Sequence, residues 1–64
     1  MSPHILRLQI DESDARGNVL RAQLAVAEAR PQARPLCERM LQERRQQYER
    51  AKEKLEAAMP GRAA

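Results

Sequence analysis

The sequence predicts a mostly α-helical protein in which a short N-terminal strand or extended segment is followed by an antiparallel helical hairpin. Three observations predict this fold. Apolar side chains alternate in residues 4–11, prolines interrupt the chain at positions 31 and 35, and an unbroken run of helix-forming residues covers 35–59. We expect one small domain over residues 1–59 and a frayed tail over residues 60–64, because Pro60-Gly61 is a strong helix stop.

Residues 4–11 are predicted to be extended. Their side chains alternate in the period of a half-buried strand, with Leu6, Leu8 and Ile10 apolar and Arg7, Gln9 and Asp11 polar. The next residues, 11–18, are rich in types that favour turns and helix caps.

Residues 19–30 permit two structures. Their alanine, leucine, glutamine and arginine content favours a helix, with Asn18 as its N-cap. Apolar residues also alternate from Leu20 to Val26, so the alternative fold is a β-hairpin closed at Gly17-Asn18 plus one long helix.

The second helix is predicted over residues 35–59. Pro31 cannot continue the preceding helix and Pro35 suits the first turn of the next, so the short connection indicates an antiparallel hairpin. Residues spaced alternately by four and three form a seam that packs on another helix: Cys37, Leu41, Arg44, Tyr48, Ala51, Leu55 and Ala58. A chain of 64 residues has little core of its own, so we expect this seam to bind another protein chain or a second copy. The expected partner contacts are Leu36, Met40, Leu41, Tyr48, Leu55 and Met59.

The composition argues against enzyme and membrane classes. His4 is the only histidine and Cys37 the only cysteine, so we expect no catalytic residues, no metal site and no cofactor. No apolar run approaches membrane-spanning length, and the N-terminus lacks the pattern of a secretion signal. An unpaired thiol and no such signal predict a cytoplasmic protein.

Three stretches, Arg7–Ile10, Leu20–Leu24 and Ala27–Arg30, give the chain a resemblance to the small co-chaperones of type III secretion needle subunits. That resemblance implies two antiparallel helices that, together with a helical-repeat chaperone, hold the needle subunit unpolymerised in the cytoplasm. The chain departs from the family pattern in the two prolines of the connection and in its strand-like start. The favoured function is therefore that of a non-enzymatic helical co-chaperone or assembly factor.

A ribbon-helix-helix DNA-binding repressor or antitoxin is the alternative function. The predicted order of strand, helix and helix suits that family, in which Arg7 and Gln9 would read base edges from paired strands. The segment Pro31–Pro35 replaces the family's short glycine-containing link, and Asp11 and Glu12 add negative charge near the phosphates. Nucleic acid is a partner only in this alternative.

Overall fold

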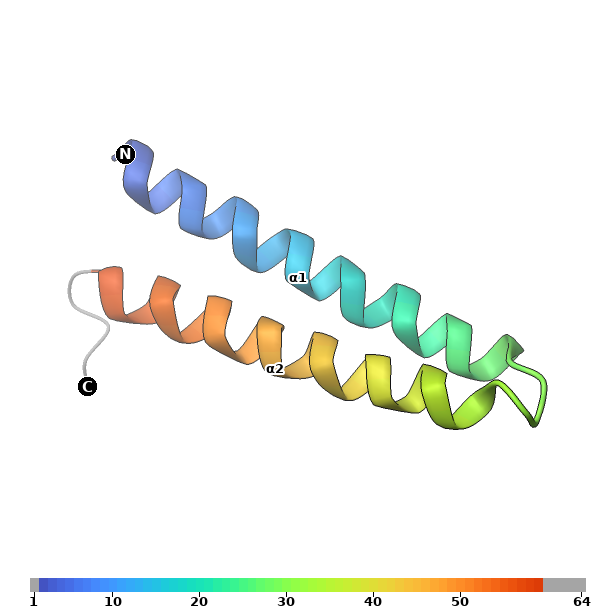
Figure 1. The fold of residues 1–64 in the computed structure, drawn as a ribbon. Coiled ribbons are helices and arrows are strands. Elements are labelled where there is room, and N and C mark those ends of the chain that lie inside the picture. Colours follow the sequence, from blue (N-terminus) through green and yellow to red (C-terminus); the bar gives the residue numbers. More distant parts are fainter. Residues whose placement is uncertain (1, 60–64) are drawn as a thin grey trace.

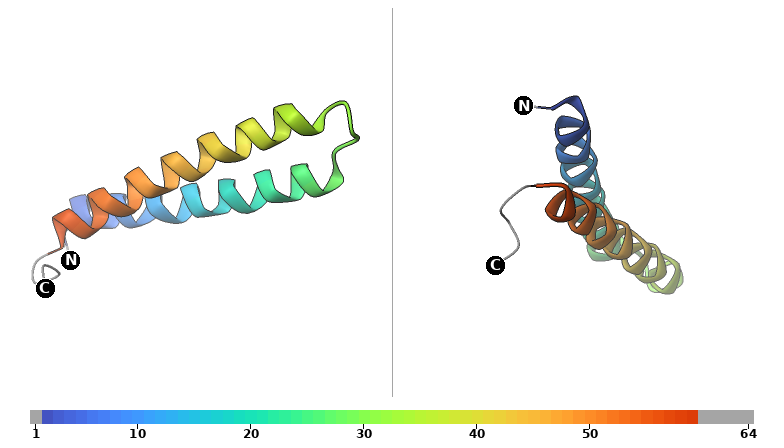
Figure 2. Two further views of the ribbon diagram at one scale, coloured as in Figure 1. Left: turned by 90° about the horizontal axis from the view of Figure 1, so that it is seen from below. Right: turned by 90° about the vertical axis from the view of Figure 1, so that its left-hand side faces the viewer.

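The computed structural model describes residues 2–59 and shows a hairpin of two antiparallel helices (Figure 1). Helix α1 spans Pro3–Glu28 and helix α2 spans Arg34–Ala58. The first turn of α1 and the last turn of α2 lie at the same end of the hairpin, opposite the connecting loop. The molecule is a single layer of two helices, 46 × 21 × 12 Å (Figure 2). The predicted helical hairpin is thereby confirmed.

Local signals at the N-terminus start α1 much earlier than predicted. Ser2 is the N-cap, and its hydroxyl oxygen accepts a hydrogen bond from the backbone N–H of Ile5 at 3.3 Å. Pro3 occupies the first helical position, where its missing N–H costs no helical hydrogen bond. The helix ends at Glu28, and Ala29 is extended and donates its N–H to the carbonyl of Val26.

The connection is short because prolines limit both helices. Pro31 follows the end of α1 and Pro35 lies in the first turn of α2, as the sequence predicts. The carbonyl of Arg30 accepts hydrogen bonds from the N–H groups of Ala33 at 2.9 Å and Arg34 at 3.1 Å, which closes the turn. Helix α2 coincides with the predicted helix to within one residue at each end. The predicted tail, residues 60–64, lies outside the described residues.

The predicted strand over residues 4–11 is wrong, because this segment is the beginning of α1. Its alternating apolar side chains belong to two faces of one helix. Leu8 is half-buried on the side that faces α2, whereas Leu6 and Ile10, four residues apart, share an exposed face. The strand-like alternation of Leu6, Leu8 and Ile10 therefore arises from a helix that is apolar on two sides.

The alternative β-hairpin is also wrong, because no strand occurs within residues 2–59. Residues 19–28 are helical as predicted, but Asn18 lies inside α1 and is not its N-cap. Gly17 and Asn18 favour turns in isolation, but both are helical here because α1 continues on either side of them. The Asn18 side chain accepts a hydrogen bond from Nη1 of Arg21 at 3.0 Å, one turn further along.

Helix α1 supplies the packing partner of the predicted α2 seam. All seven seam residues of α2 are half-buried, and we call this set the inner seam. Half-buried positions of α1 alternate by three and four in the same way: Ile5, Leu8, Glu12, Ala15, Val19, Ala22 and Val26. Pairing the two series in reverse order sets Tyr48 against Ala15 and Leu41 against Ala22, while Leu55 meets Leu8. No side chain in residues 2–59 is fully buried, so the core is one row deep.

Candidate protein-binding surface

The hairpin brings no catalytic constellation together in the residues that the structure describes. His4 is exposed in the first turn of α1, and Cys37 is half-buried in the inner seam. No group of three histidine, cysteine, aspartate or glutamate side chains in residues 2–59 could hold a metal ion. The described chain instead presents apolar and charged faces to its surroundings.

The six predicted partner-contact residues divide into two groups. Leu41, Tyr48, Leu55 and Met59 are half-buried, and the first three belong to the inner seam, which packs on α1. Leu36 and Met40 remain 58% and 45% exposed at the start of α2. The seam was predicted to bind a separate chain, but within the hairpin it is largely covered by α1. Of the six predicted contact residues, only Leu36 and Met40 leave much apolar surface for another molecule.

The largest exposed apolar surface lies on α1 and was not predicted. Leu6, Ile10, Leu20 and Leu24 are between 46% and 61% exposed. They belong to a second series spaced by four and three, which we call the outer face: Leu6, Ile10, Ser13, Gly17, Leu20, Leu24 and Ala27. At 100° per residue this series lies roughly 150° around α1 from the side that packs on α2. The signal was present in the sequence, but an expected strand over residues 4–11 divided it.

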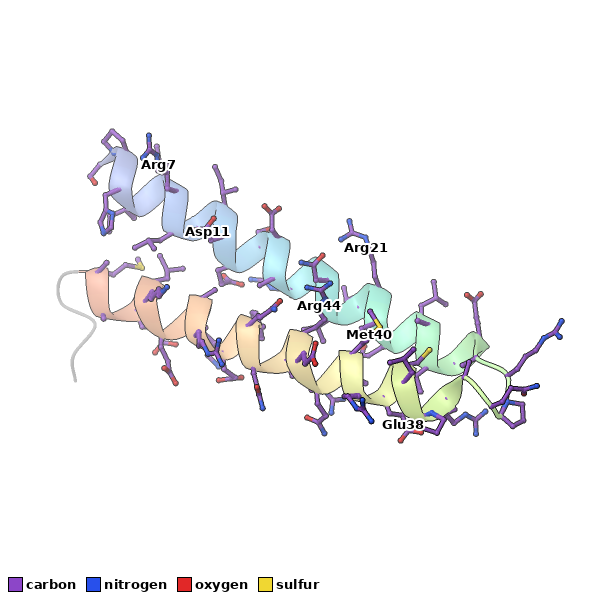
Figure 3. All side chains as sticks on the ribbon, viewed as in Figure 1. Arg7, Asp11, Arg21, Glu38, Met40 and Arg44 are labelled. Carbon is purple, nitrogen blue, oxygen red and sulfur yellow. The ribbon has the colours of Figure 1, made fainter. Side chains whose placement is uncertain are left out.

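A shallow hollow of about 220 Å³ opens beside the inner seam, near the loop end of the hairpin. Its floor is apolar and its rim carries two guanidinium groups, and the lining residues are Asn18, Arg21, Ala22, Ala25, Cys37, Met40 and Arg44. The Met40 and Arg44 side chains come from α2 and Arg21 from α1 (Figure 3). Arg44 donates a hydrogen bond from Nη1 to the amide oxygen of Gln47 at 3.1 Å. The exposed Met40 therefore adjoins a basic rim.

One ion pair, the only one in residues 2–59, neutralises a charge within the contact between the helices. The Glu12 side chain is only 14% exposed, and its carboxylate accepts hydrogen bonds from Arg16, one turn along α1. This hydrogen bond, with the charge of Glu12 and a smaller contribution from the Tyr48 hydroxyl, raises the pKa of Arg16 above its ordinary value.

The two residues expected to read DNA do not form a common surface. Arg7 and Gln9 lie on α1, and Arg7 is exposed whereas Gln9 is half-buried. Residues two apart share a face on a strand, but on a helix they point roughly 200° apart. The helix therefore separates the pair that the ribbon-helix-helix alternative requires.

Comparisons of the chain with protein-family models, with curated proteins and with solved structures found no match. Neither α1 nor α2 has a stretch sufficiently long and apolar to cross a membrane.

Proposed function

We propose that this chain is a non-enzymatic helical interaction protein, a co-chaperone or assembly factor that holds a partner protein through its amphipathic hairpin. One observation carries the proposal. After α1 and α2 have packed together, six large apolar side chains remain about half exposed: Leu6, Ile10, Leu20, Leu24, Leu36 and Met40. Exposed apolar surface of this extent on so small a molecule is typical of a protein-binding site.

The arrangement of these side chains indicates what kind of segment binds. The outer face of α1 repeats by four and three over residues 6–27, which is the spacing that accepts an amphipathic helix along its length. The partner segment is accordingly a helix with an apolar stripe. The resemblance to needle-subunit co-chaperones supports the same class of function, because those proteins are helical hairpins that help to hold a needle subunit unpolymerised.

The ribbon-helix-helix alternative has no specific support in the hairpin. That family pairs N-terminal strands from two chains, whereas residues 3–28 here form one helix. A formal net charge of +3 over 64 residues is consistent with weak, salt-sensitive attraction to DNA.

The test is photo-crosslinking in the source cell with a photoreactive residue placed at position 24, on the outer face. A matched control carries the same residue at position 46, which is exposed on the polar middle of α2. We expect a discrete protein adduct from position 24 and none from position 46. Adducts at neither position, or tight and sequence-selective binding of duplex DNA by the purified chain, would contradict the proposal.

A further inference from the structure

We infer that the outer face of α1 is a homodimer interface, on which α1 of a second copy lies antiparallel to form a four-helix assembly. The inference rests on the proposed function and names one occupant of its surface. The other copy of the chain is the partner that the spacing, charge and backbone of α1 fit.

The outer face is complementary to itself in the antiparallel direction. When two outer faces are reversed against each other about residue 15, Leu6 lies opposite Leu24 of the second copy and Ile10 opposite Leu20 of the second copy. The small residues Ser13 and Gly17 then lie opposite each other at the centre. Every large side chain meets a large one, and the two-fold symmetry repeats each pair, as a closed dimer requires.

The charges beside the outer face select the antiparallel direction. One row of α1, seven residues apart at each step, alternates in sign through Arg7, Asp14, Arg21 and Glu28. In this register Arg7 and Glu28 of the second copy lie on the same flank, five residues away from direct opposition, and so do Asp14 and Arg21 of the second copy, a spacing that long side chains span in coiled coils. On the other flank Arg16 comes near Arg16 of the second copy in the antiparallel dimer and near Arg21 of the second copy in a parallel dimer, and the parallel dimer forms no opposite pair that offsets this repulsion. The charge pattern therefore favours one orientation.

Gly17 provides an independent argument for a close approach from outside the hairpin. A glycine within a helix destabilises it relative to alanine. A Cβ atom added at Gly17 would meet only the Nη1 atom of the Arg21 side chain, at 3.6 Å, so packing within the hairpin does not require a glycine. Gly17 lies at the centre of the outer face, where two antiparallel α1 helices would approach each other most closely.

The available area fits a weak dimer. The four large side chains of the outer face, at about half exposure in each copy, offer on the order of 900 Å² between two copies. The aliphatic parts of the flanking side chains bring the interface near the lower end of the range for specific dimers, about 1,200 Å². We therefore expect reversible association that depends on protein concentration.

The first experiment measures the mass of the purified full chain by sedimentation equilibrium across a wide concentration range. We expect a monomer–dimer equilibrium that Leu20→Glu weakens by at least about tenfold. The matched control is Leu36→Glu, which makes the same change at a side chain of similar exposure, 58% against 61%, outside the outer face. Leu36→Glu should leave the dimer constant unchanged, and circular dichroism should show that both variants remain helical.

The second experiment determines the orientation in a Cys37→Ser background. Ile10→Cys and Leu20→Cys variants are mixed under a mild oxidant. The antiparallel pairing predicts a disulfide between the two different variants and little between two copies of Ile10→Cys. A charge exchange gives a further readout, because Arg7→Glu should weaken the dimer and Arg7→Glu combined with Glu28→Arg should restore it.

The outcomes separate this inference from the proposed function. A monomer at all concentrations, a dimer insensitive to Leu20→Glu, or disulfides between identical Ile10→Cys chains would overturn the homodimer. If position 24 still crosslinks to a different protein in the cell, the proposed function stands without the dimer. If the only adduct at position 24 is a second copy, the dimer stands and the role of holding another protein fails.

Discussion

At the scale of single residues, Gly17 lowers the stability of the hairpin but allows the close approach of a second α1 helix in the proposed dimer. Alanine at this position meets only the flexible end of Arg21, at 3.6 Å, and removes the cost of glycine within a helix. We expect Gly17→Ala to stabilise the monomer by about 1 kcal/mol, which raises its melting temperature by roughly 4–8 °C. Thermal unfolding at low protein concentration measures this effect. A lower melting temperature would mean that the glycine serves the hairpin itself.

Glu12 also lowers the stability of the hairpin, because its charged carboxylate is nearly covered in the contact between the helices. Leucine at this position would remove the cost of covering a carboxylate and add apolar contact with α2, so Glu12→Leu should raise the melting temperature. Arg16→Gln should lower it, since the Glu12 carboxylate would lose its charged partner. Urea unfolding of both variants compares the two directions. Destabilisation by Glu12→Leu would show that the pair is required for packing.

The charge of Arg16 gives the hairpin no pH dependence near neutrality. The pKa of Arg16 is raised in the folded chain by its hydrogen bond to Glu12, so its contribution to stability is complete below the unfolded pKa of arginine. That contribution is lost only as the pH rises through the still higher folded value. The titration of Arg16 therefore adds no slope to stability across the neutral range.

At the scale of helices, the inner seam of α2 is what the sequence predicts best. The continuous spacing from Cys37 to Ala58 identifies the buried side of α2, and the prolines at 31 and 35 identify the connection. Leu55 is half-buried in this seam, so Leu55→Ala should destabilise the hairpin by about 2 kcal/mol. Gln46→Ala, on the polar side of α2, should be nearly silent. Far-ultraviolet circular dichroism during urea unfolding measures both, and equal stabilities would show that the seam is misplaced.

Helix α1 was harder to predict because two apolar series share it. Leu8 belongs to the side that packs on α2, whereas Leu6 and Ile10 belong to the outer face, and together they imitate the alternation of a strand. Gly17 and Asn18 lowered the helix propensity at the middle, and the start signal Ser2-Pro3 stood apart from the predicted element. The same two-sided pattern that obscured the helix creates its second binding surface. The spacing of apolar residues within α2 shows that its seam packs on a helix. It does not show whether that helix belongs to the same chain or to another one.

At the scale of the whole molecule, the hairpin is a single layer with no fully buried side chain among residues 2–59, so packing within one copy leaves much apolar surface in water. Association that covers this surface stabilises the folded state by mass action, because the unfolded chain lacks the assembled face.

We therefore expect the melting temperature of the wild-type chain to rise with protein concentration, and that of Leu20→Glu to stay constant. At the lowest concentration the two chains should unfold at similar temperatures, because Leu20 is 61% exposed and contributes little to packing against α2. Differential scanning calorimetry over a concentration series makes this comparison, with Leu36→Glu as the control that should follow the wild type. Concentration-independent unfolding of the wild type would mean that one hairpin is stable by itself and that its outer face is free to bind a different helix.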